Sequence, residues 1–283
     1  MSAAVSGRQA LLLQRLAEPG PMVSVELRPP SAELAGQAGM GAWIDIHHSL
    51  GSLTRDELFV FLTDNAVGAA EEENLAHVGA NLEDDVDVRR IVPILTAKHS
   101  LEYCRMFASR AASQGFDALT VLGGDPSVPP PRCVPHGRDL RGILRERLPE
   151  LTLGGWANPH RAAAEQVGFL SADDAVADFA LTQVVSHHAT ASVADFVREL
   201  DRADTTIPLV YGSANPATLA ALDRFFPVPA TELTAEFDAG ATAEEICARS
   251  IRELRAVGAE KIYVSNLGNR GAGRRLRSIL DRV

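Results

Sequence analysis

The sequence has few cysteines, few aromatic residues and no excess of positive charge. Its three cysteines, Cys104, Cys133 and Cys247, lie far apart and form no C-x-x-C pair, which argues against a disulfide framework or a cysteine zinc cluster. The 27 Lys and Arg are outnumbered by 37 Asp and Glu, and the net charge of −10 disfavours nucleic acid and anionic lipid as partners. No apolar run approaches the ~18 residues that cross a bilayer. We therefore expect a cytoplasmic protein that binds neither membrane nor nucleic acid.

The composition is that of a globular protein. Of the 283 residues, 46% are hydrophobic and 23% are charged, which is enough apolar surface to bury a large core. Residues 1–20 place polar side chains among apolar ones and predict a short amphipathic helix. No linker divides the remainder, so residues 21–283 are expected to form a single domain.

Short β-rich segments alternate with longer segments of helical periodicity. The expected strands are 23–27, 58–63, 91–96, 118–122, 151–156, 179–184, 206–211 and 261–265. The expected helices are 101–114, 139–148, 161–170, 192–201, 217–225, 243–257 and 273–282. Most strand segments are near-continuous apolar runs, as in parallel strands buried on both faces. The pattern predicts an α/β fold, a single-domain (β/α)8 TIM barrel, with a doubly wound open sheet as the alternative.

In such a barrel, functional side chains lie just past the C-terminal ends of the strands. Glu26 lies in an otherwise apolar strand end, where burial favours the neutral carboxyl that a general acid needs. An ion pair with Arg28 is its structural alternative. Asp125 follows two glycines and either contacts a ligand or caps the turn. Gln183 is an amide in an apolar strand, and either a ligand or neighbouring backbone would satisfy it.

Two further patterns are candidate ligand sites. Residues 268–275 (GNRGAGRR) follow the last strand and form either a phosphate cradle or a glycine turn into a basic helix. His187 and His188 are adjacent, and neighbouring side chains on a strand point to opposite faces. These histidines are therefore expected to be polar loop residues, and no metal site is predicted.

The strand-end motifs together resemble those of the methylenetetrahydrofolate reductase family, (β/α)8 barrels that reduce methylenetetrahydrofolate to methyltetrahydrofolate. Residues 25–30 (VELRPP) stand where the family has F-E-F-F-P-P, residues 123–125 (GGD) where it has R-G-D, and residues 181–183 (LTQ) where it has I-T-Q. The resemblance implies that Glu26 is the catalytic acid and that Asp125 and Gln183 bind the folate. Asn215, past the seventh strand, is expected to join the folate-binding residues.

The resemblance also implies a nicotinamide cofactor, NAD(P)H, and puts FAD in question. Cofactor-binding residues are expected at the other strand ends: Thr63, Asn65, Thr96, Gly124, Trp156, His160, Ser265 and Asn266. Gly123 replaces the family's arginine, and residues 171–174 (SADD) replace a basic cluster that holds the flavin diphosphate. Either a flavin is held differently, with 268–275 at its phosphates, or the hydride comes directly from the nicotinamide.

Two other functions stay open at this point. The loss of flavin-site charges also suits a non-catalytic folate- or nucleotide-binding barrel that acts with another one-carbon protein. Residues 268–275 also suit a barrel enzyme that acts on a small phosphorylated substrate.

Overall fold

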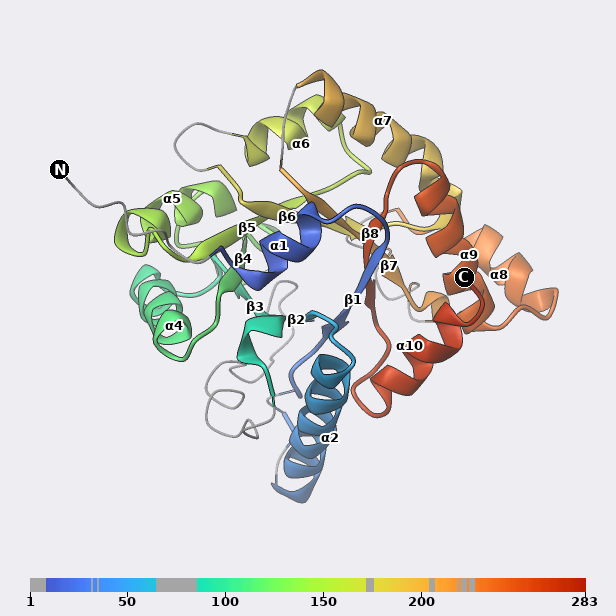
Figure 1. The fold of residues 1–283 in the computed structure, drawn as a ribbon, viewed down its shortest axis with the longest axis horizontal. Coiled ribbons are helices and arrows are strands. Elements are labelled where there is room, and N and C mark those ends of the chain that lie inside the picture. Colours follow the sequence, from blue (N-terminus) through green and yellow to red (C-terminus); the bar gives the residue numbers. More distant parts are fainter. Residues whose placement is uncertain are drawn as a thin grey trace.

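Eight parallel strands close into one barrel in the computed structural model (Figure 1). The structure describes residues 9–31, 33–34, 36–64, 86–171, 176–203, 207–217, 219, 223 and 227–283. The strands follow one another around the barrel in chain order, and the first pairs with the last, Val25 lying opposite Val264. The predicted (β/α)8 TIM barrel is thus confirmed, and the open-sheet alternative is wrong because no strand of the closed barrel has a free edge.

All predicted strands are present, and one is displaced along the sequence. The strands are β1 (Met22–Leu27), β2 (Val60–Leu62), β3 (Ile91–Thr96), β4 (Ala118–Leu122), β5 (Thr152–Ala157), β6 (Phe179–Val184), β7 (Leu209–Ala214) and β8 (Lys261–Ser265). The predicted range 206–211 for β7 is wrong by three residues. Gly212, which suggests a strand end, instead lies in the strand opposite Tyr263, and a Cβ there would lie 2.6 Å from the Tyr263 hydroxyl oxygen.

Helices cover the outside of the barrel. They are α1 (Leu11–Ala17), α2 (Gly36–Arg55), α4 (Leu101–Ser113), α5 (Gly137–Arg147), α6 (Ala163–Leu170), α7 (Thr190–Arg202), α8 (Ala230–Asp238), α9 (Ala243–Ala256) and α10 (Ala272–Leu280), with short 3-10 helices η1 (Val88–Arg90) and η2 (His187–Ala189). Most of the predicted helix 217–225 lies outside the described residues. In the described part of the chain, no helix combines the length and apolar character that a bilayer crossing requires.

Helices α2 and α8 were not predicted. The four glycines of α2 weaken its helical signal, because glycine costs about 1 kcal/mol relative to alanine inside a helix. Its buried face is nevertheless helical in spacing, with Trp43, Ile46, Leu50 and Leu53 all buried. Packing of this face against the barrel explains why the helix forms despite its glycines.

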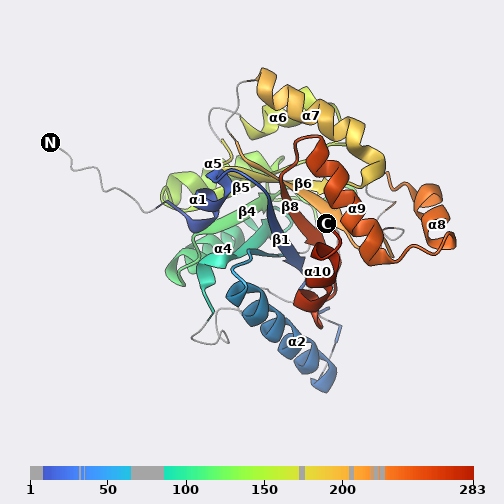
Figure 2. The same cartoon turned by 45° about the vertical axis from the view of Figure 1, so that its right-hand side comes forward.

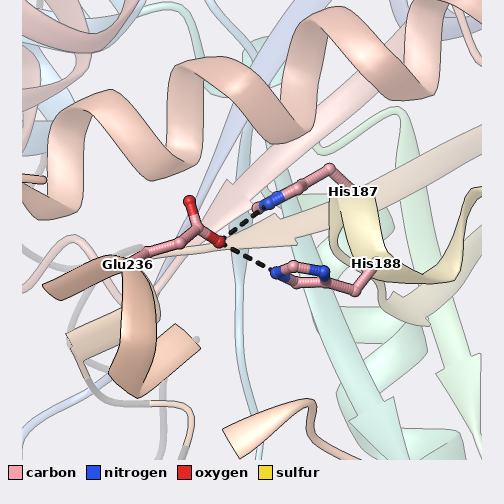
Figure 3. Close-up of side chains that lie close together, drawn as sticks. All are labelled: His187, His188 and Glu236. Atoms are coloured by element: carbon pink, nitrogen blue, oxygen red, sulfur yellow. Dashed lines mark hydrogen bonds and ion pairs between the residues drawn. The ribbon is translucent and has the colours of Figure 1, made fainter. Parts of the chain in front are cut away.

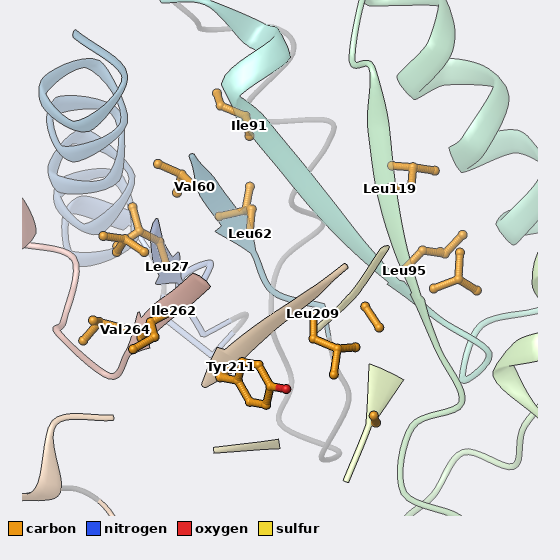
Figure 4. Packing of buried hydrophobic residues seen from close by; sticks show 14 of the residues in the cluster. Leu27, Val60, Leu62, Ile91, Leu95, Leu119, Leu209, Tyr211, Ile262 and Val264 are labelled. Carbon is orange, nitrogen blue, oxygen red and sulfur yellow. The ribbon is translucent and has the colours of Figure 1, made fainter. Parts of the chain in front are cut away.

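Alternate side chains of each strand pack in two layers. The outer layer lies between the strands and the helices, as Figure 4 shows for Leu27, Val60, Leu62, Ile91, Leu95, Leu119, Leu209, Tyr211, Ile262 and Val264. The inner layer fills the barrel and includes Phe61, Phe179 and Tyr263. The Phe61 ring centroid lies 6.5 Å from that of Phe179 and 6.0 Å from that of Tyr263. The barrel interior is therefore a packed core, and any ligand must enter above it.

Helix α1 lies across one end of the barrel in both views (Figures 1 and 2). Its Leu12 and Leu16 are buried in the inner cluster with Met22, at the start of β1. The backbone N–H of Leu11 donates to Asp117, just before β4, at 3.4 Å. The helix therefore closes the N-terminal end of the barrel, and the open end is the one where the strands finish.

Candidate functional site

A cavity of about 390 Å³ lies at the C-terminal ends of the strands. It is lined by eight of the residues predicted for the site: Glu26, Thr63, Gly124, Asp125, Trp156, Gln183, Ser265 and Asn266. Thr96, His160 and Asn215 are not part of its lining, and Asn65 lies outside the described residues. The strand ends thus bring most of the predicted residues around one space, as a TIM barrel does.

Glu26 lines the cavity beside a buried tyrosine that sequence reasoning missed. Tyr263 is fully buried in the inner layer, and its hydroxyl donates to the backbone carbonyl of Thr182. Burial, and secondly the charge of the nearby Glu26, raises the pKa of Tyr263 well above its ordinary value. The Trp156 ring centroid lies 6.5 Å from that of Tyr263, and both rings line the cavity. A carboxyl group and the partly exposed ring of Trp156 therefore line the cavity, with the Tyr263 ring buried behind them.

Gln183 lies where the β6–β7 pairing is irregular, between Leu181 and Val184. Such irregularities at barrel rims re-aim side chains. The Oε1 atom of Gln183 accepts a hydrogen bond from the backbone N–H of Val184 at 2.9 Å. The amide group that Gln183 can offer to a ligand is therefore the donor Nε2. The two partners considered for Gln183 from the sequence, a ligand and neighbouring backbone, are compatible, because the backbone uses Oε1 and a ligand can use Nε2.

Asp125 caps a turn and lines the cavity at the same time. Its Oδ1 accepts hydrogen bonds from the backbone N–H and the hydroxyl of Ser127, at 2.8 and 2.6 Å. These hydrogen bonds, aided by the charges of Lys98 and Arg132, lower the pKa of Asp125 despite partial burial. Asp125 is thus a carboxylate at neutral pH, suited to accept hydrogen bonds from a ligand.

Thr96 does not line the cavity but hydrogen-bonds to Asp64, which does. Its backbone N–H and its hydroxyl both donate to Asp64 Oδ2, at 2.8 and 2.9 Å. The imidazole Nε2 of His99 lies 2.8 Å from the same oxygen. Asp64 itself lines the cavity. Thr96 therefore fixes the Asp64 carboxylate at the end of β2.

His160 and Asn215 hold loop backbone near the cavity. The Nε2 atom of His160 lies 2.9 Å from the carbonyl oxygen of Val184, at the end of β6. The Oδ1 atom of Asn215 accepts a hydrogen bond from the backbone N–H of Ala217 at 3.0 Å. In this structure both side chains shape the rim of the barrel.

Five arginines, none of them predicted as a site residue, also line the cavity: Arg28, Arg132, Arg138, Arg141 and Arg161. Arg141 is only 3% exposed, and burial is the main reason that its pKa falls to about 10, which still leaves it charged at neutral pH. Its Nη2 donates to the carbonyl of Phe169 at 3.0 Å. The spacing of Arg138 and Arg141, three residues apart in α5, was a readable signal for a cationic helix face.

Arg132 lies where the arginine of the resembled family is missing. A Cβ on Gly123 would lie 3.1 Å from the guanidinium carbon of Arg132. Arg132 donates to the carbonyl of Gly124 through Nε at 3.0 Å and to that of Pro135 at 2.9 Å. Gly123 therefore leaves space for a guanidinium group supplied from nine residues further along the chain. The expected shortage of positive charge at this point of the cavity is wrong for the described residues.

Residues 268–275 form a turn at the start of α10 that is held by hydrogen bonds to neighbouring backbone. Gly268 and Gly271 have positive φ angles, 71° and 72°, which favour glycine. Asn269 donates from Nδ2 to the carbonyl of Arg28 at 2.8 Å, and Arg275 donates to the carbonyl of Leu267. None of the three arginines of this segment lines the cavity. The structure thus favours the glycine-turn alternative over the phosphate cradle.

The side chains of His187 and His188 lie side by side and face the same carboxylate. The expectation that they point to opposite faces is therefore wrong. They belong to η2, not to a strand, and their ring centroids lie 4.0 Å apart. The Nε2 atoms of His187 and His188 lie 2.9 and 2.8 Å from Oε1 of Glu236, in α8 (Figure 3). Burial first, and then the neighbouring His188, lowers the pKa of His187. These three residues form a second group of titratable side chains, separate from the cavity lining.

Comparison with known proteins supports the barrel fold but assigns this sequence to no known family. No model of a known protein family matches the sequence, and no curated protein sequence does. A solved structure of an uncharacterized protein from Clostridium thermocellum, described as binding two copies of 5-methyl-5,6,7,8-tetrahydrofolic acid, has a TM-score of 0.67 at 14% identity over 96% of this chain and 98% of that chain. A 2,3-dimethylmalate lyase of the PEP mutase/isocitrate lyase superfamily has a TM-score of 0.51 at 12% identity over 95% of this chain and 82% of its own. At these identities the likeness is one of barrel architecture.

Proposed function

We propose that this protein is an oxidoreductase similar to methylenetetrahydrofolate reductase, which transfers a hydride to the one-carbon unit of methylenetetrahydrofolate and gives methyltetrahydrofolate. The observation that carries the proposal is the meeting of Glu26, Asp125 and Gln183 around one cavity at the open end of the barrel. These are the residues for which the sequence motifs imply an acid and two folate-binding groups. The barrel from Clostridium thermocellum, described as binding a methyltetrahydrofolate, supports a folate ligand.

The polar residues of the cavity match the edge of a pterin. A pterin presents hydrogen-bond donors and acceptors side by side in one plane. The Asp125 carboxylate can accept from its donors, and the Gln183 Nε2 can donate to its acceptors. The partly exposed ring of Trp156, backed by the buried ring of Tyr263, offers an apolar surface against which a flat heterocycle can pack. Such contacts fix the orientation of the substrate, which is a large part of catalysis.

Glu26 is the proton donor in this proposal. Methylenetetrahydrofolate carries its one-carbon unit in a five-membered ring between two nitrogens. Glu26 donates its proton to one of these nitrogens, so that the C–N bond breaks and the one-carbon unit becomes an iminium cation. The hydride then adds to that carbon and completes the methyl group. The packed inner layer below Glu26 keeps bulk water from that side of the cavity.

The cationic wall of the cavity fits the diphosphate of a nicotinamide cofactor. Arg132, Arg138 and Arg141 lie in the wall formed after β4 and at the start of α5. Arginine binds phosphate oxygens with paired N–H donors. A Cβ on Gly137 would lie 2.8 Å from the backbone nitrogen of Gly123, so the chain is closely packed here. When bound, NAD(P)H supplies the hydride, and we propose direct transfer without FAD.

The experiment is turnover of methylenetetrahydrofolate with NADH or NADPH by the purified protein and its Glu26→Gln variant. The variant keeps the shape of the side chain and removes the proton, so we expect a roughly 10²- to 10⁴-fold lower rate. The exposed Glu150→Gln, before β5 at the opposite end of the barrel, is the matched control and should keep the rate. Circular dichroism establishes that both variants fold. Wild-type turnover in Glu26→Gln would contradict the assigned role.

The visible spectrum of the purified protein tests the cofactor. Direct transfer predicts a colourless protein that is active with NAD(P)H alone. One bound flavin per chain would replace direct transfer with a flavin mechanism, and the arginines of the cavity would then serve the flavin diphosphate.

A second function has its own support. The barrel from Clostridium thermocellum is described by the methylated folate that it binds. A barrel that binds methyltetrahydrofolate and presents it to another one-carbon protein would use the same cavity. Tight binding of methyltetrahydrofolate by the wild-type protein without any turnover would favour this function over the reductase.

A further inference from the structure

Three potential metal ligands converge at the rim of the barrel. His187 and His188 lie in η2, just after β6, and Glu236 lies in α8 (Figure 3). Their ligand atoms all lie within 4.8 Å of one another. Both imidazole Nε2 atoms face the same carboxylate oxygen, Oε1 of Glu236, at 2.9 and 2.8 Å. Two nitrogens and one oxygen from two separate elements thus surround one point in space.

The three side chains are largely withdrawn from solvent. The side chains of His187, Glu236 and His188 are 10%, 13% and 27% exposed. Glu236 also lines a surface recess of about 480 Å³ between the end of α8 and α9, and His188 is the most exposed of the three side chains. The group is therefore buried enough to hold its geometry and open enough to admit an ion.

The surroundings orient the ligands. The Nδ1 atom of His187 lies 3.0 Å from the hydroxyl of Ser250, in α9, and this hydroxyl also accepts the backbone N–H of His187 at 3.4 Å. A hydrogen bond on Nδ1 fixes the imidazole so that Nε2 presents its lone pair to a metal. Arg249 donates to the other carboxylate oxygen of Glu236, Oε2, at 2.5 Å. Oε1 is left as the oxygen that faces both histidines.

We propose that His187, His188 and Glu236 bind one divalent transition-metal ion, zinc in the first place, with the remaining coordination position directed to water. Two imidazole nitrogens and one carboxylate oxygen are a donor set that zinc accepts, and three protein ligands leave a fourth position open. The charge of Arg249 opposes a cation nearby, but its hydrogen bond also holds the carboxylate in place. Apolar contacts already join α8, through Leu233, to the end of β6 at Val184. The ion would join α8 to η2, which begins four residues beyond Gln183.

The test uses the full chain after removal of metals with a chelator. Calorimetric titration with Zn²⁺ should show one ion per chain. Co²⁺ should give the visible absorption of a four- or five-coordinate site with nitrogen and oxygen ligands. His188→Ala and Glu236→Gln should each weaken Zn²⁺ binding by more than about 100-fold, a greater loss than the 10- to 100-fold expected for Ser250→Ala, which removes only a supporting hydrogen bond. The exposed His48→Ala, in α2, is the matched histidine control and should bind as the wild type does.

Several results would overturn the proposal. One is the absence of a stoichiometric ion in the wild-type titration, and another is unchanged Zn²⁺ affinity in both His188→Ala and Glu236→Gln. A thiolate-to-cobalt charge-transfer band would place the ion on a cysteine. If Glu236→Gln does not fold, His188→Ala decides alone, because its side chain is the most exposed of the three. The readout is metal binding and is independent of the proposed reductase activity.

Discussion

Gly154 lies in β5 inside the barrel, and we predict that Gly154→Ala destabilises the protein. A Cβ at this position would lie 2.5 and 2.8 Å from two ring carbons of Phe179, whereas carbon atoms in contact prefer about 3.5 to 4.0 Å. Overpacking of this kind costs about 1 to 3 kcal/mol. The less flexible unfolded chain of the alanine variant returns about 0.4 to 1 kcal/mol. The midpoints of these ranges leave a net loss of about 1.3 kcal/mol, which should lower Tm by about 2 to 4 °C for a chain of this size.

The assay is thermal unfolding followed by circular dichroism, with two further variants. Gly168 lies in α6 with nothing within 4 Å of its Cβ position, so Gly168→Ala should raise Tm through helix propensity. Phe179→Leu should relieve the contact, so that the double variant with Gly154→Ala is more stable than the two single changes would add up to. An unchanged Tm in Gly154→Ala, or strict additivity with Phe179→Leu, would refute the inner-layer packing described above.

Three further predictions concern the site and its chemistry. Gln183→Ala should weaken methyltetrahydrofolate binding by about 1 to 3 kcal/mol and leave NADH binding unchanged, whereas Arg138→Ala should weaken NADH binding and leave folate binding unchanged. Calorimetric titration with both ligands checks this. A loss of folate affinity in Arg138→Ala would indicate that the arginines bind the carboxylates of the folate instead. Hydrogen bonds from Arg89 lower the pKa of Asp87 from its ordinary 3.8, so the stabilising effect of its carboxylate is present above that pH and is lost as the pH falls through the lower folded-state pKa. Asp87→Asn should therefore lower Tm at pH 7, and the difference from the wild-type Tm should shrink steadily as the pH is lowered below 3.8. Burial raises the pKa of Cys104 to about 12, so iodoacetamide at pH 8 should alkylate the half-buried Cys133 and leave Cys104 unmodified until the protein unfolds, as mass spectrometry of peptides would show.

The barrel was predictable because most of its strands are nearly continuous apolar runs. Strands of a closed barrel are buried on both faces, as the uniformly buried Ile91–Thr96 of β3 shows. The predicted segment of β7 ends at Tyr211, whereas the strand continues through Gly212, and glycine weakens a strand pattern. The actual role of Gly212 is to make room for Tyr263, which lies 51 residues further along the chain. A sequence pattern within one segment cannot reveal a requirement imposed by a distant side chain.

The histidine pair could not be interpreted from its spacing alone. Adjacent residues diverge on a strand but lie side by side in the short 3-10 helix that His187 and His188 form. Their carboxylate partner, Glu236, is 48 residues from His188 and lies in a helix that the sequence pattern did not reveal. Both the local conformation and the distant partner had to be known before three ligands could be recognised.

The arginines of the cavity show how charge can be kept in space while it moves along the sequence. A motif comparison finds Gly123 where the resembled family has arginine, and it concludes that a positive charge has been lost. In the structure, the absence of a side chain on Gly123 is what admits the guanidinium of Arg132, at 3.1 Å from the Cβ position. A phosphate or carboxylate in the cavity responds to where the charge lies, because electrostatic energy depends on distance and surroundings and not on chain position. The departure from the motif is therefore no argument against an anionic ligand, and the buried Arg141 nearby argues in favour of one.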